Sequence, residues 1–291
     1  MPEKLLIEFS GKKNLSKYVR ALIVGEVGAP LTEFAMSAEK PFWISVNANM
    51  TALATKTNLP FVNVEDDESL LDIKNLIKDG TINCDTVVID RLDELQRKMF
   101  LKRMIKEKRD FLKSEDWNWM EAKLNQIIGS FCSLEKDIII LCASKEAGGF
   151  DGQDFMTRPD IQGGFSTDIY SYVDYALLAT SEYEGKEQSF PASIRTTASH
   201  RYPWIFDKTK ELSDFPIEDP ELGFNVLKKS RDWFVANLQE NKEPIELDLI
   251  DVTTPAEKEL LTGMSKDDKL NKLLNKNKNK KEQNASSTSK K

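Results

Sequence analysis

The sequence predicts an α/β fold, in which a mostly parallel sheet carries helices on both faces. The apolar runs at 87–89 (Val-Val-Ile) and 138–141 (Ile-Ile-Ile-Leu) lack the polar alternation of a sheet with one face in water. Strands that are covered on both faces read in this way. The apolar runs also stand about 30 to 45 residues apart, which leaves room for crossover helices between parallel strands.

Strands are expected where short apolar runs are bounded by turn residues. The run at 20–25 ends in Gly25 and the run at 84–90 ends in Asp90, so both expected strands finish on a residue of functional interest. The expected strands cover 5–9, 20–25, 41–46, 60–64, 84–90, 137–143, 172–180, 192–198 and 245–250.

Helices are expected where apolar residues recur at a spacing of three or four. Segment 68–78 has this spacing, and Gly80 is a typical stop signal after it. Asp116 is a candidate N-cap for the amphipathic segment that follows it. The expected helices cover 32–38, 68–78, 92–108, 117–134, 222–237 and 255–261.

Composition divides the 291 residues into four segments. A polar N-terminal segment at 1–19 precedes an α/β core at 20–212, and a C-terminal appendage at 213–264 follows a proline-containing linker. The segment 265–291 has few apolar residues to bury and is expected to be a disordered, lysine-rich tail. Residues 266–291 hold nine lysines against three acids, +6 in all, so the formal net charge of −7 leaves −13 on residues 1–265.

The same composition excludes several classes of protein. No apolar run reaches the roughly 18 residues of a membrane span, and no pattern typical of a signal peptide follows Met1. Three cysteines without CxxC spacing argue against a disulfide scaffold or a zinc site, and a single histidine argues against multi-histidine metal chemistry. We therefore expect a protein of the cytoplasm with no membrane partner.

The segment after the first core strand occupies the position of a phosphate-binding loop. Its sequence, Gly-Glu-Val-Gly-Ala-Pro-Leu-Thr from Gly25 to Thr32, aligns with the pattern G-x-x-x-x-G-K-[ST]. Gly25, Gly28 and Thr32 suit a nucleotide site, but Pro30 stands where the second glycine belongs and Leu31 where the lysine belongs. Proline offers no N–H to a phosphate, and leucine offers no charge. An ordinary strand-turn-helix reading stays open.

Asp90 gives this position its context. A buried strand that ends in aspartate is the Walker B arrangement, in which the carboxylate reaches Mg²⁺. Thr32 and Asp90 are therefore the candidate Mg²⁺ residues, and a plain turn residue at Asp90 is the alternative. Lys145, which follows the strand at 137–143, is a candidate replacement for the missing lysine. The alternative for Lys145 is a solvated or ion-paired side chain.

Several short motifs follow one another along the chain in a characteristic order. They are the turn from Gly25 to Ala35, Ser37 to Pro41, the strand ending at Asp90, Asp116-Trp117, the strand at 138–143 with Ser144-Lys145-Glu146, Arg158-Pro159-Asp160, Gly163-Gly164, and Val173 to Ala176. In order and spacing they resemble the phage-encoded RecA-like nucleotide-binding proteins, a family that includes single-strand annealing recombinases, over roughly residues 18–212. The resemblance implies a RecA-like core that binds ATP and Mg²⁺, self-assembly or a RecA-like partner, and single-stranded DNA as a ligand.

The sequence departs from the family at three places. Pro30 and Leu31 replace the glycine and lysine of the loop, and Asn47 stands where active relatives have a carboxylate that activates water. The late Lys-x-Arg that relatives use across a subunit interface reads Ser199-His200-Arg201, so only Arg201 remains as an interface residue. Without the lysine charge and the carboxylate base, the chain lacks the main interactions that lower the barrier to phosphoryl transfer. We expect a degenerate ATPase, in which no residue is catalytic and binding of ATP and Mg²⁺ is in doubt.

The segment 146–167 is rich in glycine and is expected to be a loop that faces DNA in the family's arrangement. Phe150, Arg158 and Phe165 are the candidate DNA-binding residues, since aromatic rings stack on bases and arginine contacts the backbone. The alternative is a surface loop whose phenylalanines pack on the core. The tail lysines Lys276, Lys278 and Lys280 would add salt-sensitive contacts with any sequence.

Three functions follow from these expectations. The first is a phage-type RecA-like protein of DNA recombination or replication that binds single-stranded DNA or an active partner, with little or no ATP hydrolysis. The second is an active, ATP-dependent annealing protein that tolerates an unusual loop. The third is a non-catalytic interaction scaffold that has lost both ATP and DNA.

Overall fold

The computed structural model describes most of the expected core, and the compact unit that contains these residues spans 1–242. The expected strands at 5–9 and 245–250, the expected helix at 255–261 and the tail at 265–291 lie outside the described residues. The described residues are 16–25, 28–46, 59–64, 66–147, 156–180, 193–212, 217–220 and 223–240.

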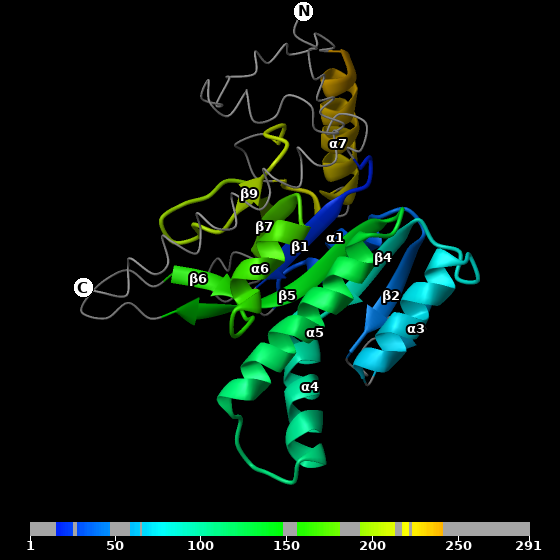
Figure 1. Cartoon of the computed structure of the whole chain (residues 1–291). Helices are drawn as coiled ribbons and strands as arrows, with labels where there is room; N and C mark the ends of the chain where they lie inside the picture. Colours follow the sequence, from blue (N-terminus) through cyan, green and yellow to red (C-terminus); the bar gives the residue numbers. More distant parts are fainter. Residues whose placement is uncertain are drawn as a thin grey trace, which may run out of the picture. The chain divides into compact units, whose positions relative to one another are not determined.

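A mostly parallel sheet forms the centre of this unit, in the order β3-β2-β4-β5-β1-β7-β8 (Figure 1). All neighbours from β3 to β7 are parallel, whereas β6, β8 and β9 pair antiparallel with β5, β7 and β7. The predicted α/β fold with a mostly parallel sheet is confirmed, and its RecA-like type stays a prediction. The strands are β1 (Arg20–Gly25), β2 (Pro41–Ser45), β3 (Phe61–Asn63), β4 (Thr86–Asp90), β5 (Asp137–Ala147), β6 (Met156–Pro159), β7 (Tyr175–Thr180), β8 (Ser193–Arg195) and β9 (Phe206–Asp207).

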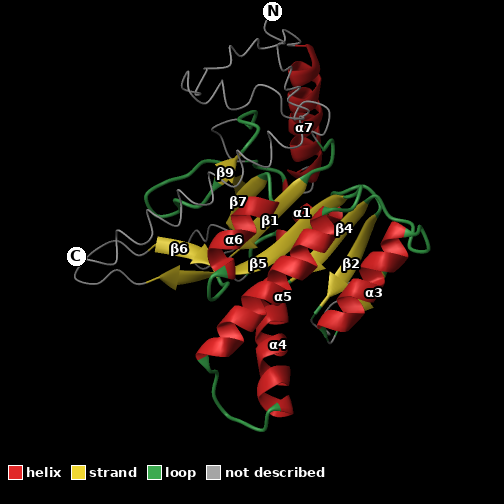
Figure 2. Cartoon of the chain, viewed as in Figure 1, coloured by secondary structure: helices red, strands yellow, loops and turns green. Residues whose placement is uncertain are grey.

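Helices cover both faces of the sheet, as Figure 2 shows. Alternate strand residues point to two separate apolar clusters because a strand has a side-chain period of two. One cluster packs under α3, α4, α5 and α6, and the other packs under α1 and α7. No helix in the described part of the chain is long and apolar enough to cross a membrane. The helices are α1 (Leu31–Met36), α3 (Asp67–Lys78), α4 (Leu92–Lys106), α5 (Ser114–Cys132), α6 (Phe165–Tyr172) and α7 (Gly223–Glu240).

The segment 146–167 differs most from its expectation. Part of it is regular structure, because β5 continues to Ala147, β6 returns antiparallel beside it, and α6 begins at Phe165. The expected strand at 172–180 is correspondingly shorter, since α6 occupies its start and β7 begins at Tyr175. Gly163, at a φ of 73°, makes the turn into α6 that a glycine-rich sequence permits.

The helix expected at 222–237 is α7, and it packs on the second face of the sheet. Phe224 and Leu227 of α7 join the apolar cluster there. The Nζ of Lys228 lies 3.1 Å from a carboxylate oxygen of Asp137, and Arg231 lies 3.5 Å from Asp174. These contacts attach α7 to the sheet, while the four-segment division of the chain stays a prediction.

Candidate functional site

The carboxyl ends of the parallel strands bring the predicted site residues to one edge of the sheet. Gly25 at the end of β1 pairs in register with Ala143 of β5, and Ser45 at the end of β2 pairs with Asp90 of β4. This is the edge at which open α/β sheets bind their ligands. Asn47, which follows β2 and stands where active relatives have a carboxylate, lies outside the described residues.

The turn after β1 is built from apolar contacts. A Cβ atom added to Gly25 would lie 2.9 Å from Cγ of Leu31 and 3.0 Å from Cβ of Ala29. The Leu31 side chain, which stands at the lysine position, therefore folds back over the end of β1. Leu31 and Ala29 both pack against the apolar cluster of the second face. The space directly over Gly25 is filled by leucine.

The helix that follows this turn offers little to an anion. α1 has only six residues, Pro30 precedes it, and no side chain caps its N-terminus. The N–H of Leu31 is already donated to the carbonyl of Ala29 at 2.8 Å. Gly28 adopts a φ of 84°, so it supplies the reversal of the turn. Thr32 lies in the first turn of α1 and is partly exposed.

Asp90 is a carboxylate without a counter-charge in direct contact. Burial raises the pKa of Asp90 to about 6, and the positive charge of Arg91 only partly offsets this. Its side chain makes no hydrogen bond or ion pair with the residues that the structure describes. Such a group could accept a cation, because a positive charge would remove the cost of burying the carboxylate.

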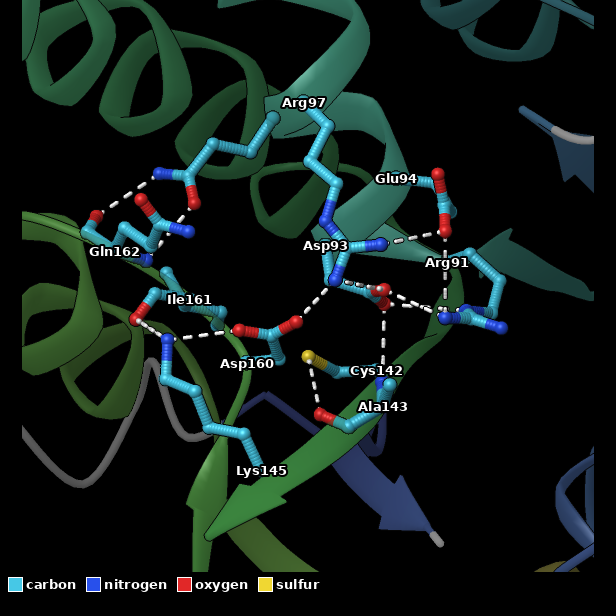
Figure 3. Close-up of polar contacts among 11 residues, drawn as sticks. Arg91, Asp93, Glu94, Arg97, Cys142, Ala143, Lys145, Asp160, Ile161 and Gln162 are labelled. Carbon is cyan, nitrogen blue, oxygen red and sulfur yellow. Dashed lines mark hydrogen bonds and ion pairs between the residues drawn. The ribbon is translucent and has the colours of Figure 1, made fainter. Parts of the chain in front are cut away.

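The residues after Asp90 turn away from that carboxylate and bind β5. Arg91 has a left-handed backbone, with a φ of 75°, and its guanidinium lies 2.7 Å from the carboxylate of Asp93. Asp93 is buried and accepts the N–H of Ala143 at 3.0 Å. Figure 3 shows Asp93 between these two partners. The start of α4 is thereby attached to the middle of β5.

Lys145 takes part in the same polar network. Its Nζ lies 2.8 Å from a carboxylate oxygen of Asp160 and 3.4 Å from the carbonyl oxygen of Ile161 (Figure 3). The second oxygen of Asp160 contacts Arg97 of α4. Lys145 is thus ion-paired, which is the alternative left open for it above, and its role as a phosphate ligand stays a prediction.

Two glutamines complete the connection between α4 and the segment before α6. The Nε2 of Gln96 donates to the carbonyl of Gln162 at 2.9 Å, and the N–H of Gln162 donates to Oε1 of Gln96 at 2.8 Å. Sequence reasoning missed Gln96 and Asp93. The sequence signals for this network were Lys145 and Asp160, which both lie within motifs that carry the family resemblance.

The structure describes two of the predicted DNA-binding residues, Arg158 and Phe165, and they belong to different elements. Arg158 is exposed on β6, in register with Lys145. Phe165 is fully buried in the first apolar cluster, which is the alternative left open for the phenylalanines above, and its role in base stacking stays a prediction. It faces the core because it opens the apolar stripe of α6, which continues at Ile169. Phe150, Lys276, Lys278 and Lys280 lie outside the described residues.

Arg201 belongs to a cationic group beside β6. Its carbonyl accepts the N–H of Thr157, and its guanidinium is half exposed, 3.4 Å from Glu146. The Cζ atoms of Arg201 and Arg195 lie 5.6 and 5.4 Å from the ring centroid of Tyr202. The Nε of Arg195 is buried and has no hydrogen-bond partner among the described residues. This group was predicted only through Arg201.

These features define an α/β protein with a mostly parallel sheet, in which the predicted phosphate-loop position is apolar. Two solved structures resemble it in fold. One is a KaiC-like protein from the archaeon Pyrococcus horikoshii OT3, at 14% identity and a TM-score of 0.38, over 62% of this chain and 77% of that one. The other is the flagellar accessory protein FlaH from Methanocaldococcus jannaschii, at 11% identity and a TM-score of 0.36, over 70% and 90%.

At these identities the two similarities concern the fold alone. No protein family and no curated protein matches the chain.

Proposed function

We propose that this chain is a phage-type RecA-like protein of DNA recombination or replication that works without hydrolysing ATP. The observation that carries the proposal is the Leu31 side chain over Gly25. A phosphate-binding loop needs backbone N–H groups and a cation at this place. Here a leucine occupies it, and the residues present do not fit a nucleotide phosphate.

The loss of hydrolysis follows from the chemistry of phosphoryl transfer. Catalysis of that reaction is almost entirely positioning and electrostatic stabilisation of the developing charge. Leu31 supplies no charge and Pro30 no N–H, and the nearby Lys145 is held by Asp160. Asp90 alone cannot replace these terms, because a carboxylate acts on the phosphate only through a bound Mg²⁺.

Binding is the activity that remains. Arg158 is exposed on β6, and the cationic group of Arg195, Arg201 and Tyr202 lies beside this strand. Arginines beside an aromatic ring suit a single strand of DNA. An active RecA-like partner, or a further copy of this chain, is the other ligand that this function requires. The basic tail would strengthen DNA binding through its charge.

The test is calorimetric titration of the full chain with ATP, with and without Mg²⁺, and hydrolysis measured in the same samples with single-stranded DNA. We expect neither binding nor turnover. The variant Pro30→Gly/Leu31→Lys restores the loop residues, and we expect it to gain ATP binding. Wild-type turnover that Asp90→Ala abolishes would overturn the proposal in favour of an active ATP-dependent annealing protein.

A further inference from the structure

Exposed apolar side chains gather where α4 passes into α5. We call residues 101–113 the hairpin tip; it comprises the end of α4 and the connection to α5, and Figure 1 shows this end of the helix pair extending beyond the sheet. Leu101, Ile105 and Phe111 are 53, 67 and 64% exposed, and they are three of the seven large apolar side chains that are exposed in the described part of the chain. Apolar side chains exposed together in this way are typical of an interaction site.

Lysines accompany the apolar residues along the helix. Lys102 and Lys106 each follow an apolar residue by one position, so an apolar row and a cationic row run side by side at a spacing of four. Lys102 lies 3.0 Å from Asp66. Lys106 and Lys108 are exposed and form no ion pair with the described residues. The hairpin tip is therefore both apolar and positive.

The conformation of the hairpin tip is fixed by a buried ionic network around Asp116 of α5. Asp116 is fully buried and accepts hydrogen bonds from Arg103, from Arg109 and, at 2.7 Å, from the N–H of Lys113. These partners hold the pKa of Asp116 well below its usual range, with Arg109 the largest cause. Arg109 also donates to the carbonyl of Phe111 at 3.1 Å. The exposure of Phe111 is thus set by a buried ionic network rather than by a loose loop.

We propose that the hairpin tip docks an acidic amphipathic helix of another protein. An apolar row beside a cationic row is complemented by a helix that carries leucine-like and acidic rows at the same spacing. Residues 1–265 carry a net charge of −13, so an acidic helix is repelled by most of the remaining surface. Charge therefore directs the acidic helix to the hairpin tip. This inference does not depend on the function proposed above.

Other occupants fit the hairpin tip less well. Two of its three apolar side chains are aliphatic, whereas single-stranded nucleic acid is bound by stacking on aromatic rings. A stable dimer buries about 800 Å² on each partner, far more than three partly exposed side chains offer. A membrane surface would require an apolar face along most of a helix.

The test uses a fluorescein-labelled peptide of about 21 residues, with leucines at helical spacing and glutamates between them. Its binding to the full chain is followed by anisotropy at low and high salt. We expect saturable binding that Ile105→Ser and Phe111→Ser each weaken about tenfold. Lys106→Glu should weaken binding about threefold at low salt and have no effect at high salt.

Leu76→Ser and Lys78→Glu are the matched controls, because Leu76 is a 41% exposed apolar residue of α3 and Lys78 an exposed lysine of the same helix. Neither should change the affinity. Absence of binding, or equal binding of a peptide with lysine in place of glutamate, would overturn the proposal. The proposal would also be overturned if Ile105→Ser abolished self-association, binding of oligo(dT) or binding to anionic phosphatidylserine vesicles. Each of these results would assign the hairpin tip to another occupant.

Discussion

Asp66 shows how one side chain can serve two elements. It is the N-cap of α3, where its carboxylate accepts the N–H of Ser69 at 2.8 Å, and it also pairs with Lys102 of α4 at 3.0 Å. The hydrogen bonds from Ser69 are the largest cause of its pKa of about 2. We expect Asp66→Ala to lower the free energy of unfolding by about 1 kcal/mol at pH 7, measured by urea denaturation.

The pH dependence of this loss has a definite sign. The pKa of Asp66 is lower in the folded than in the unfolded chain, so its stabilisation is complete above about pH 5 and fades as the pH falls from about 4 toward 2. The wild-type advantage over Asp66→Ala should shrink across that range. Asp66→Asn keeps a capping oxygen and should lose less at pH 7; an equal loss would contradict the capping role.

Gly25 and Leu31 are coupled residues, and this coupling underlies the proposed function. A methyl group at Gly25 would press on Leu31 and Ala29 at about 3 Å. We expect Gly25→Ala to destabilise the chain by about 1 to 3 kcal/mol. In Gly25→Ala/Leu31→Ala part of that loss should return, which a double-mutant cycle of unfolding free energies measures. Strict additivity would mean that Leu31 does not lie over Gly25.

The sequence identified the residues of this turn but not their packing. Pro30 and Leu31 are visible as departures from a motif, so the missing charge and N–H could be predicted. That Leu31 folds back over β1 depends on the conformation of the turn around Gly28, which no local pattern encodes. Likewise, the pairing of Lys145 with Asp160 joins β5 to residues that follow β6, and only the tertiary fold brings them together.

At the scale of elements, α7 packs closely on α1 at Gly223. A Cβ at Gly223 would lie 2.7 Å from Cε2 of Phe34, whose ring is fully buried. We expect Gly223→Ala to cost about 1 to 3 kcal/mol of unfolding free energy in urea. Gly164→Ala is the control: its Cβ would meet the carboxyl carbon of Glu121 at 2.5 Å, but that flexible side chain can turn away. An equal loss in both variants would contradict this packing.

The elements that sequence reasoning missed share a cause. β6 has four residues and α6 eight, and both lie in a stretch where glycines and a proline suppress local signals. β6 is a strand because β5 offers it an edge, and α6 is a helix because Phe165 and Ile169 find a cluster to enter. The long apolar strands and the periodic helices depend less on such partners, which is why α3, α4 and β4 were predicted closely.

The molecule as a whole combines an acidic body with a basic tail, and this charge distribution predicts that its DNA binding depends on salt. Binding through lysine and arginine releases counterions, so the logarithm of the affinity falls linearly with the logarithm of the salt concentration. We expect labelled oligo(dT) to bind with such a slope in an anisotropy titration. Arg158→Ala should reduce the slope by about 0.7, the value for one contact with a single strand, and deletion of 266–291 should reduce it by several times that amount.

The control for this experiment is Lys229→Ala, an exposed lysine of α7 far in sequence from both DNA-binding candidates. It should leave the slope unchanged, because only cations that contact phosphates release counterions. If DNA binds with the wild-type slope after both Arg158→Ala and the deletion, the DNA-binding face lies elsewhere on the molecule. If no DNA binds at all, the non-catalytic scaffold function replaces the proposed one. The positive charges of the tail and of Arg158 would then be too weak to hold a DNA strand on an otherwise acidic protein.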